Sequence, residues 1–533
     1  MGKAGAHKLE TVAGKGKTSV LTYIDIGTNS IRLLIVRLNA NYSYTVLRQD
    51  KEIVRLGEKE YENGRLLSQK AMDRSVLVCK NFVEVARSYG SKNVTAAATS
   101  ATREAENRDI FLERLRKVAG IDAKVISGRE EARLVYLGIV SGVHIGKEDC
   151  LFIDIGGGST EIAIGDQYCH SYLDSIELGS IRLTSMFLKD GGAGRVDKKT
   201  YEEMKLYAKN SMLRAAEEIA NHGIKRAFGS SGTIVNLAEI AARLNGTRIT
   251  KRDLSLKHKD LKRVIAKLCS VPLTARRRIP GINPDRADII IGGAVILDTL
   301  MEEFMLGEIK PSERGLLHGM LMDDLSRRKG FSQFNKITVR DWSALQLGRS
   351  CNLRENHANR VTTLSLQLFD SAKKTGLHSL GIEERDLLKY AAFLHDVGDF
   401  ISYTDHNLHS HYMIKNSELL GFDQREINII AAIARYHTKK MPKRKELEEK
   451  GYDKETLEKI NILSAILRIG ESLDRSHSGS IAKARFAKNG KKEVMLKIWP
   501  VKNCELERWG VESNKASFEK TFKKKISLRI IGK

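Results

Sequence analysis

The chain contains one strand-and-turn motif twice. Residues 23–30 read YIDIGTNS and residues 152–159 read FIDIGGGS. Each copy is an apolar strand that enters a polar, glycine-containing turn, and a second β-rich run follows at residues 31–36 and 160–164. Glycine lets a turn backbone approach a ligand closely, and successive N–H groups in such a turn can form an anion-binding nest. The repeat therefore predicts two hairpins that face each other and hold a phosphate chain and its metal from both sides.

Five ordered motifs narrow the class of protein. They are residues 98–105 (ATSATREA), 126–133 (ISGREEAR), 154–161 (DIGGGSTE), 177–184 (ELGSIRLT) and 229–233 (GSSGT). The duplication resembles the actin, sugar-kinase and Hsp70-chaperone superfamily. Within that superfamily the motifs resemble the exopolyphosphatase and guanosine pentaphosphate phosphohydrolase (Ppx/GppA) family, over nearly the whole chain except about the first twenty residues.

The resemblance and the residue patterns together predict an α/β fold. We expect a duplicated actin-like (ribonuclease H-like) two-lobed core, followed by an all-α HD-like domain and a small α+β C-terminal domain. After residue 328 the apolar residues recur with helical spacing, for example over 356–375 and 454–472. The expected boundaries are a disordered basic arm at 1–19, lobe I at 20–143, lobe II at 144–326, the helical HD-like domain at 327–477 and the basic β-containing domain at 478–533.

The charge of the chain favours an anionic partner. Its 90 Lys and Arg against 66 Asp and Glu give a net charge of +24 over 533 residues. Polyphosphate, a nucleotide, nucleic acid or a membrane surface would each fit that charge. Residues 481–533 hold 15 Lys and Arg against 5 Glu. Because a long polyanion is the substrate class of the family that the chain resembles, we expect inorganic polyphosphate as the partner, and neither nucleic acid nor a membrane. We also expect a homodimer.

The cysteine pattern and the N-terminus predict a cytoplasmic protein. Six scattered cysteines form no C-x-x-C pair, which argues against a disulfide framework and for a reducing compartment. No run of eighteen apolar residues occurs, and residues 1–17 lack the apolar stretch of a signal peptide. Residues 16–18 (GKT) look like the end of a P-loop, but the first glycine of that motif would fall on Thr11, so we reject it.

Phosphoanhydride hydrolysis requires donors that hold the phosphate oxygens. Arg103 offers a planar fork that suits bidentate phosphate binding. The remaining expected phosphate-binding residues belong to the two turns. They are Gly27, Thr28, Asn29, Ser30, Gly156, Gly157, Gly158, Ser159 and Thr160.

The same chemistry needs a metal ligand and a base. Asp154 ends the second strand and Glu161 lies just across its turn, and one or two carboxylates are enough for a Mg²⁺ site. The matching positions of the resembled family support a bound divalent ion. Glu130 and Glu131 are adjacent on a predicted helix and point about 100° apart, so only one can face the cleft. The resemblance implies that Glu131 is the catalytic base.

The predicted helical domain carries a second candidate metal site. His357, His395, Asp396 and Asp474 follow the order H…HD…D, and their surroundings resemble the HD superfamily of metal-dependent phosphohydrolases. Imidazole and carboxylate groups on facing helices suit a transition metal or Mg²⁺. HD-like domains of relatives are thought to serve as binding or dimerising platforms, so a second catalytic centre is not the favoured interpretation. Three further histidines are possible supplementary ligands, although we favour an ordinary structural role for them. They are His406, His409 and His437.

These observations predict a phosphatase that removes terminal orthophosphate from inorganic polyphosphate with Mg²⁺ as cofactor. The alternative substrate is guanosine pentaphosphate, alone or as a second activity of the same site. A non-catalytic sensor of polyphosphate or alarmone is disfavoured because the expected base, metal ligands and both turns are present. A kinase is disfavoured because the motif around Glu131 is not that of the superfamily's kinases.

Overall fold

The computed structural model describes residues 17–58, 64–246, 253–328, 338–438 and 452–531. The arm expected over residues 1–19 therefore lies outside the described residues as far as residue 16. Two compact units contain the described chain, one up to Val339 and one from Arg340 onwards. Within the described residues, every helix is too short or too polar to cross a membrane.

Lobe I is built on a sheet with strand order β3-β2-β1-β4-β5. β1 (Ser19–Ile26), β2 (Ser30–Leu38) and β3 (Tyr44–Ile53) form an antiparallel meander, while β4 (Val94–Ala98) and β5 (Ala123–Val125) run parallel to β1. Side chains of β1, β2 and β4 form a core with the apolar face of α1. The helices of this lobe are α1 (Gln69–Ser88), α2 (Ser100–Glu104) and α3 (Arg108–Arg114), with a π-helical turn at Leu115–Ala119.

Lobe II repeats this topology. β6 (Cys150–Ile155), β7 (Thr160–Gly165) and β8 (His170–Ile176) form the meander, and β9 (Ala227–Ser230) and β11 (Glu308–Pro311) continue it in parallel. The order β8-β7-β6-β9-β11 is thus that of lobe I, with β10 (Leu256–Lys257) added at the edge. The predicted duplication of an actin-like lobe is confirmed.

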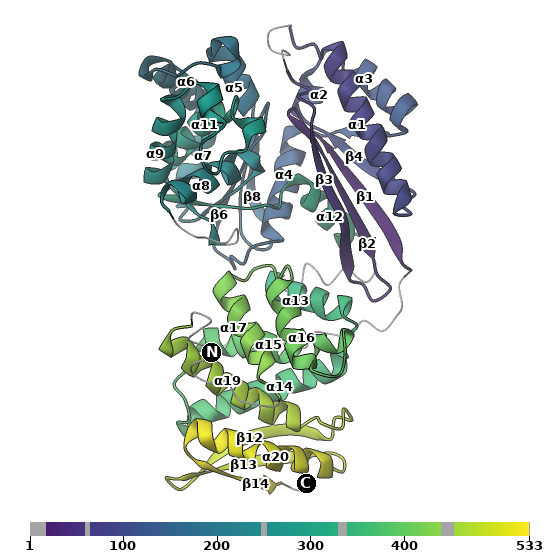
Figure 1. The fold of residues 1–533 in the computed structure, drawn as a ribbon, viewed down its shortest axis with the longest axis vertical. Helices are drawn as coiled ribbons and strands as arrows, with labels where there is room; N and C mark the ends of the chain where they lie inside the picture. The colour runs from purple at the N-terminus through teal and green to yellow at the C-terminus, as the bar shows by residue number, and fades with distance from the viewer. Residues whose placement is uncertain (1–16, 59–63, 247–252, 329–337, 439–451, 532–533) are drawn as a thin grey trace. The chain divides into compact units, whose positions relative to one another are not determined.

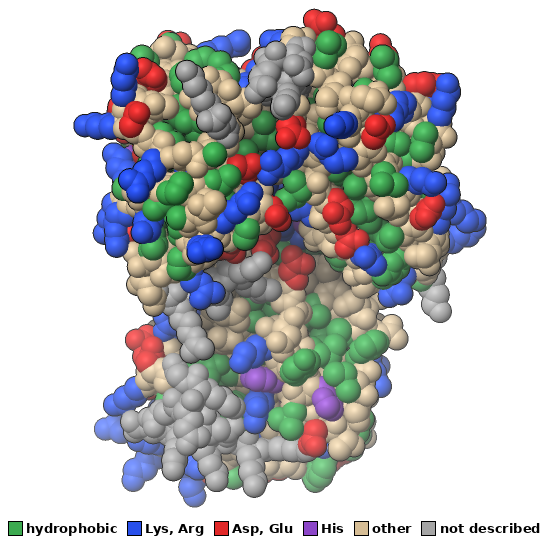
Figure 2. Space-filling view, turned by 45° about the horizontal axis from the view of Figure 1, so that its top comes forward, with side chains coloured by type: hydrophobic (Ala, Val, Ile, Leu, Met, Phe, Trp, Pro, Cys, Tyr) green, Lys and Arg blue, Asp and Glu red, His purple; other side chains and the backbone are tan. Residues whose placement is uncertain are grey.

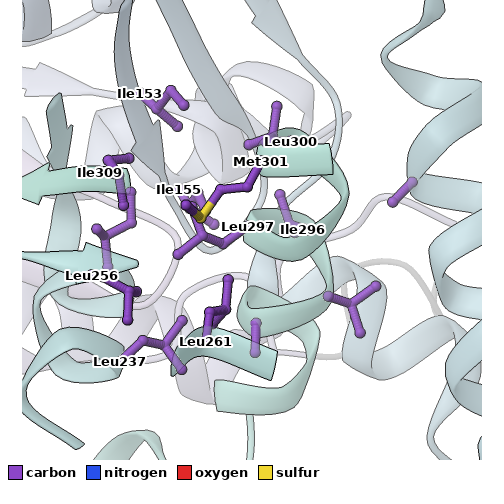
Figure 3. Close-up of a cluster of buried hydrophobic side chains, with 14 of the residues drawn as sticks. Ile153, Ile155, Leu237, Leu256, Leu261, Ile296, Leu297, Leu300, Met301 and Ile309 are labelled. Carbon is purple, nitrogen blue, oxygen red and sulfur yellow. The ribbon is translucent and has the colours of Figure 1, made fainter. Parts of the chain in front are cut away.

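The core of lobe II forms around a helix that is buried over most of its length. α11 (Ile290–Glu303) packs against β6, and Figure 3 shows Leu297, Leu300 and Met301 of this helix beside Ile155 of the strand. An apolar helix without a polar face is stable only inside a core. The other helices of the lobe are α5 (Ser180–Phe187), α6 (Lys198–Ser211), α7 (Leu213–Ala220), α8 (Ser231–Leu244), α9 (His258–Cys269) and α10 (Leu273–Arg276).

Two crossing helices join the lobes, between the two sheets in Figure 1. α4 (Gly128–Val140) follows lobe I in the sequence but packs on β7 and β8, whereas α12 (Leu316–Ser326) follows lobe II but packs on β1 and β2. Their backbones touch, because a Cβ at Gly319 would lie 1.8 Å from the carbonyl oxygen of Leu134. Only glycine permits this crossing, which fixes the direction in which α4 enters the space between the lobes.

The second unit is helical with a small sheet at its C-terminal end. Its first helices are α13 (Val339–Ser350), α14 (Glu355–Thr375), α15 (Ile382–Leu394), α16 (His406–Asn416), α17 (Gln424–Arg435) and α19 (Lys454–Ser472). β12 (Ile481–Asn489) pairs antiparallel with β13 (Glu493–Pro500), which pairs in parallel with β14 (Lys525–Ile530). α20 (Glu505–Phe522) packs on α19, and β12 packs on α14. The predicted helical and β-containing regions are therefore both present, and they share one compact unit.

Candidate active site

The two glycine turns have the same geometry and meet across the space between the lobes. The amide of Gly27 donates to the carbonyl of Ser30 at 3.1 Å, and the amide of Gly156 donates to that of Ser159 at 2.9 Å. A Cβ at Gly157 would lie 3.0 Å from the Cβ of Thr28, so the second turn must be bare of a side chain where it faces the first. The backbone of both turns is therefore available to one ligand.

Four carboxylates converge on the pocket that these turns line. Asp25, Glu131 and Glu161 are buried, and Asp154 is partly buried. The pocket is also lined by most of the expected phosphate-binding residues, namely Gly27, Thr28, Asn29, Ser30, Gly156, Gly157, Gly158 and Ser159. Its remaining described lining residues are Arg32, Thr99, Ser100, Ile155, Ser180, Ser231, Arg286 and Leu316.

The carboxylates raise one another's affinity for protons. Burial and the neighbouring Asp154 raise the pKa of Glu161 to about 7. Burial, with a smaller contribution from Asp154, raises the pKa of Asp25 to about 6. Burial and the nearby Glu161 raise the pKa of Glu131 well above its usual value, although Arg103 opposes this. Several negative charges in one pocket, most of them on buried side chains, are costly, and a bound cation would reduce that cost.

The residues present fit a divalent cation. Oδ1 of Asp154 is buried and, within the described structure, has no hydrogen-bond partner. Both polar side-chain atoms of Asn29, in the facing turn, are also buried without a partner. Buried polar atoms are nearly always paired, so orphaned oxygens in a carboxylate cluster indicate where a ligand binds. Oε1 of Glu161 accepts from Ser175 at 2.9 Å, which holds this second carboxylate in place.

Arginines add a positive side to the pocket. Arg32 lies opposite Asp25 in the register of the first hairpin and borders the exposed Lys51 on β3. Arg286, from the short 3₁₀ helix Pro284–Arg286, is buried and donates to Thr233 at 3.3 Å. Burial and the nearby Arg32 lower the pKa of Arg286 to about 10. Two guanidinium groups that disfavour each other are a favourable environment for an anion.

Glu130 and Glu131 point in different directions, as their spacing on a helix requires. Nη1 of Arg103 donates to Oε2 of Glu131 at 2.9 Å and to the carbonyl of Ile126 at 3.0 Å. Glu131 lines the pocket, whereas Glu130 pairs with Arg133 at 2.8 Å. Arg103 is therefore engaged with the carboxylate in this structure, and its side chain fixes the orientation of Glu131.

Two polar residues of the motifs stabilise the structure around the cleft through internal hydrogen bonds and an ion pair. The hydroxyl of Thr160, an expected phosphate ligand, donates to the carbonyl of Leu178 and does not line the pocket. Arg182 is buried, donates to the carbonyl of Gly158 at 3.0 Å and forms an ion pair with Glu104 of lobe I. This pair joins α5 to α2 across the two lobes.

Sequence reasoning missed three charged residues of the pocket. Asp25 could have been found, because it occupies in the first repeat the position that Asp154 occupies in the second. Arg32 could have been found in the same way, because it occupies in the first repeat the position that Glu161 occupies in the second. Arg286 carries no local signal, because it reaches the pocket only through the packing of lobe II.

In the helical unit, the predicted HD residues come together. Nδ1 of His357 lies 2.8 Å from Oδ2 of Asp474, and its Nε2 lies 3.6 Å from Oδ2 of Asp396. Nε2 of His395 lies 3.3 Å from the same Asp396 oxygen. His357, His395 and Asp396 could hold a metal ion, as could Asp396 with two further histidines. The other oxygen of Asp474 accepts from the amide of Gly479 at 2.9 Å.

The additional histidines behave differently from one another. His406 and His437 belong to the Asp396 cluster, contrary to our structural interpretation of them. His409 lies outside this cluster. The signal that could have distinguished them is weak, because three histidines within six residues of α16 offer no local reason to choose one.

Comparison with known proteins identifies the family. Residues 34–328 match the Ppx/GppA phosphatase family, and residues 339–515 match domain III of Ppx/GppA phosphatases. A guanosine-5'-triphosphate,3'-diphosphate pyrophosphatase of Pseudoalteromonas translucida (strain TAC 125) is 28% identical over 434 residues, covering 80% of this chain and 82% of that protein.

Solved structures resemble the two-lobed unit. An exopolyphosphatase from Cytophaga hutchinsonii ATCC 33406 has a TM-score of 0.53 and 26% identity, and covers 57% of this chain and 98% of its own. An exopolyphosphatase-like protein has the same TM-score and identity over 58% of this chain and 98% of its own. With the family match extending over both units, the chain belongs to the Ppx/GppA phosphatase family.

Proposed function

We propose that the chain is an exopolyphosphatase, which releases terminal orthophosphate from inorganic polyphosphate by hydrolysis of a phosphoanhydride bond. The observation that carries this proposal is the composition of the cleft. Its described lining combines glycine turns, carboxylates and arginines, and includes no aromatic side chain. Pockets for organic ligands are mostly lined by apolar and aromatic groups. A chain of phosphates offers only oxygens, which this lining matches.

Asp154 and Glu161 would hold Mg²⁺ in this proposal. Glu161 is buried and Asp154 is partly buried, and the buried Oδ1 of Asp154 lacks a hydrogen-bond partner within the described structure. When bound, the ion would neutralise charge on the phosphoryl oxygens. A cation beside these carboxylates would also lower the raised pKa of Glu131, so that the base is ionised at neutral pH.

The residues of the chain would perform the remaining steps. Backbone N–H groups of both turns, the amide of Asn29 and the guanidinium of Arg32 would hold the terminal phosphates. Glu131, oriented by Arg103, would align the attacking water and accept its proton. The water oxygen bonds to the terminal phosphorus, the bridging P–O bond breaks, and the shortened polyphosphate leaves with the bonding electrons.

Guanosine pentaphosphate is the second candidate substrate. The support is the relative from Pseudoalteromonas translucida, which is named for guanosine-5'-triphosphate,3'-diphosphate and shares 28% identity over 80% of this chain. Removal of its terminal phosphate breaks the same type of bond, so one cleft could perform both reactions. The guanine base would then bind outside the pocket described above.

The deciding experiment measures orthophosphate release from long-chain polyphosphate and from guanosine pentaphosphate side by side, with Mg²⁺. We expect kcat/KM to be higher for long-chain polyphosphate than for guanosine pentaphosphate. A higher kcat/KM for the nucleotide, with no release from polyphosphate, would replace the first proposal with the second. Absence of release from both substrates would reject the hydrolase assignment of this cleft.

A further inference from the structure

In the helical unit, the two oxygens of Asp396 face different pairs of histidines. Oδ2 lies 3.3 Å from Nε2 of His395 and 3.6 Å from Nε2 of His357. Oδ1 lies 3.5 Å from Nε2 of His437 and 3.6 Å from Nε2 of His406. One carboxylate is therefore shared between two separate triads, and the ligand atoms of each triad lie within 4.8 Å of one another.

These separations are those of ligands around a metal. A distance of 3.6 Å is too long for a hydrogen bond. Two ligands that each lie about 2.1 Å from a tetrahedrally coordinated ion are roughly 3.4 Å apart. Each oxygen of Asp396 and its two imidazoles thus have the spacing that one ion requires.

In all four histidines, the hydrogen bond of Nδ1 leaves Nε2 as the nitrogen that can bind a metal. Nδ1 lies within hydrogen-bonding distance of a backbone carbonyl in three of them, at 2.8 Å for His395, 2.5 Å for His437 and 3.0 Å for His406. A carbonyl can only accept, so each Nδ1 donates, and a neutral ring then presents a bare lone pair at Nε2. In His357, Nδ1 lies 2.8 Å from the carboxylate of Asp474, which accepts its hydrogen bond in the same way. Metal-ligating histidines are typically oriented in this way.

The Nε2 atoms of the four histidines fall into two pairs. Those of His357 and His395 are buried without a hydrogen bond, and the two residues are only 5% and 0% exposed. Nε2 of His406 lies 3.1 Å from Nε2 of His437. Because both Nδ1 atoms donate to carbonyls, two neutral rings would face each other here with lone pairs, and either a shared proton or a metal cation relieves that repulsion. The unpartnered Nε2 atoms of His357 and His395 and this facing pair are both suited to metal ions.

We propose that this unit contains a dinuclear metal centre bridged by Asp396. His357 and His395 hold one ion, His406 and His437 hold the other, and Asp474 positions His357. A set of four imidazoles and one carboxylate suits divalent transition metals such as Zn²⁺, Fe²⁺ or Mn²⁺ better than Mg²⁺. The centre is independent of the proposed Mg²⁺ site in the cleft.

One edge of the centre is open to solvent. The side chains of His406 and Asp396 are 18% and 16% exposed. Figure 2 shows histidine side chains at the surface of the helical unit. Tyr403, which is 82% exposed, stacks on the ring of His406 with ring centroids 5.8 Å apart. Water or another oxygen ligand can reach the ions from this side, because a site with only three protein ligands keeps an open position.

The test counts metal ions in the full chain. To exclude the cleft, the protein carries Asp154→Asn and Glu161→Gln, is stripped with chelator and is then loaded with Mn²⁺. Elemental analysis should give two ions per chain. The further double substitution His406→Ala with His437→Ala should leave one ion, and Asp396→Ala should leave none. His409→Ala, on the same helix as His406 but outside the cluster, is the matched control and should retain both.

Electron paramagnetic resonance supplies a readout that needs no substitution in the helical unit. Two Mn²⁺ ions that share a carboxylate should give an exchange-coupled spectrum, and loss of His406 and His437 should convert it to that of an isolated ion. Fewer than two ions in the loaded protein, or an uncoupled spectrum at two ions per chain, would overturn the bridged centre. Circular dichroism of each variant identifies any that has failed to fold, and the coupled spectrum stands independently of such a failure.

Discussion

The two hairpins at the centre of the cleft share the same backbone geometry but carry different charged side chains. Asp25 pairs in register with Arg32 in lobe I, and Asp154 pairs with Glu161 at the equivalent positions of lobe II. Duplication supplied two matching turns, each closed by the same Gly-to-Ser hydrogen bond. The two hairpins differ at one charged position, where the first has Arg32 and the second has Glu161. We infer that the first hairpin binds the phosphate anion and that the second binds the cation.

The largest expected effect concerns Glu131, the proposed base, whose pKa is raised by burial and by the nearby Glu161 of the second hairpin. Glu131→Gln should keep the fold and the affinity for polyphosphate, but should lower turnover by roughly 10²–10⁴-fold, because the attacking water loses its proton acceptor. Steady-state orthophosphate release measures this. Glu130→Gln is the matched control, since Glu130 pairs with Arg133 away from the pocket. Turnover near the wild-type value in Glu131→Gln would refute the mechanism.

The comparison of the two aspartates comes next in size. Asp154→Asn should raise the Mg²⁺ concentration for half-maximal activity by about 10–100-fold, which is a typical range for a disturbed metal site. Asp25→Asn, at the equivalent position, should raise it less, because Asp25 faces an arginine and not a second carboxylate. A Mg²⁺ titration of both variants tests the difference. Equal shifts would mean that the two hairpins share the metal.

The first hairpin should influence binding of the anion. Arg32→Gln should raise KM for polyphosphate roughly tenfold with a smaller change in kcat, since a hydrogen bond to a charged group is worth about 1.5–3 kcal/mol. Arg32→Lys should recover part of the loss because it restores the charge without the planar fork. Kinetics at several polyphosphate concentrations separate KM from kcat. A fall in kcat alone would assign Arg32 to the chemical step.

The smallest effect is on stability without metal. The pKa of Glu161 rises from its ordinary 4.5 to about 7 on folding, so the folded chain binds this proton more tightly than the unfolded chain does. Stability should therefore fall as the pH rises from about 4.5 to about 7. Glu161→Gln cannot ionise, so it should be more stable than wild type by about 1–3 kcal/mol above this range and little different below it.

Thermal unfolding of both proteins in chelator, between pH 5 and pH 8, measures this difference. Mg²⁺ should abolish the advantage of the variant by stabilising the wild-type carboxylates. If the stabilities of the two proteins instead change in parallel with pH, then folding does not raise the pKa of Glu161 and this carboxylate is ionised in the metal-free cleft.

Much of the fold follows from short stretches of sequence. The hairpin strands, their glycine turns and the helices of the second unit were predicted close to their observed bounds, for example residues 454–472 against Lys454–Ser472. Local pattern does not show every detail, since α3 ends at Arg114 and continues into a π-helical turn that ends before Gly120. Gly120 adopts a φ of 68°, a left-handed conformation that favours glycine and ends the helix.

The sequence by itself determined the duplicated scaffold, because alternating apolar residues and glycine turns act over a few neighbours. It also indicated the turn residues and three of the four carboxylates, Glu131, Asp154 and Glu161, that could form a phosphate site. Only the tertiary structure decided that Arg286 reaches this site, that Arg103 holds Glu131, and which histidines share Asp396. These contacts join residues far apart in the chain, and their existence depends on how helices such as α4 and α12 pack, which no local pattern encodes.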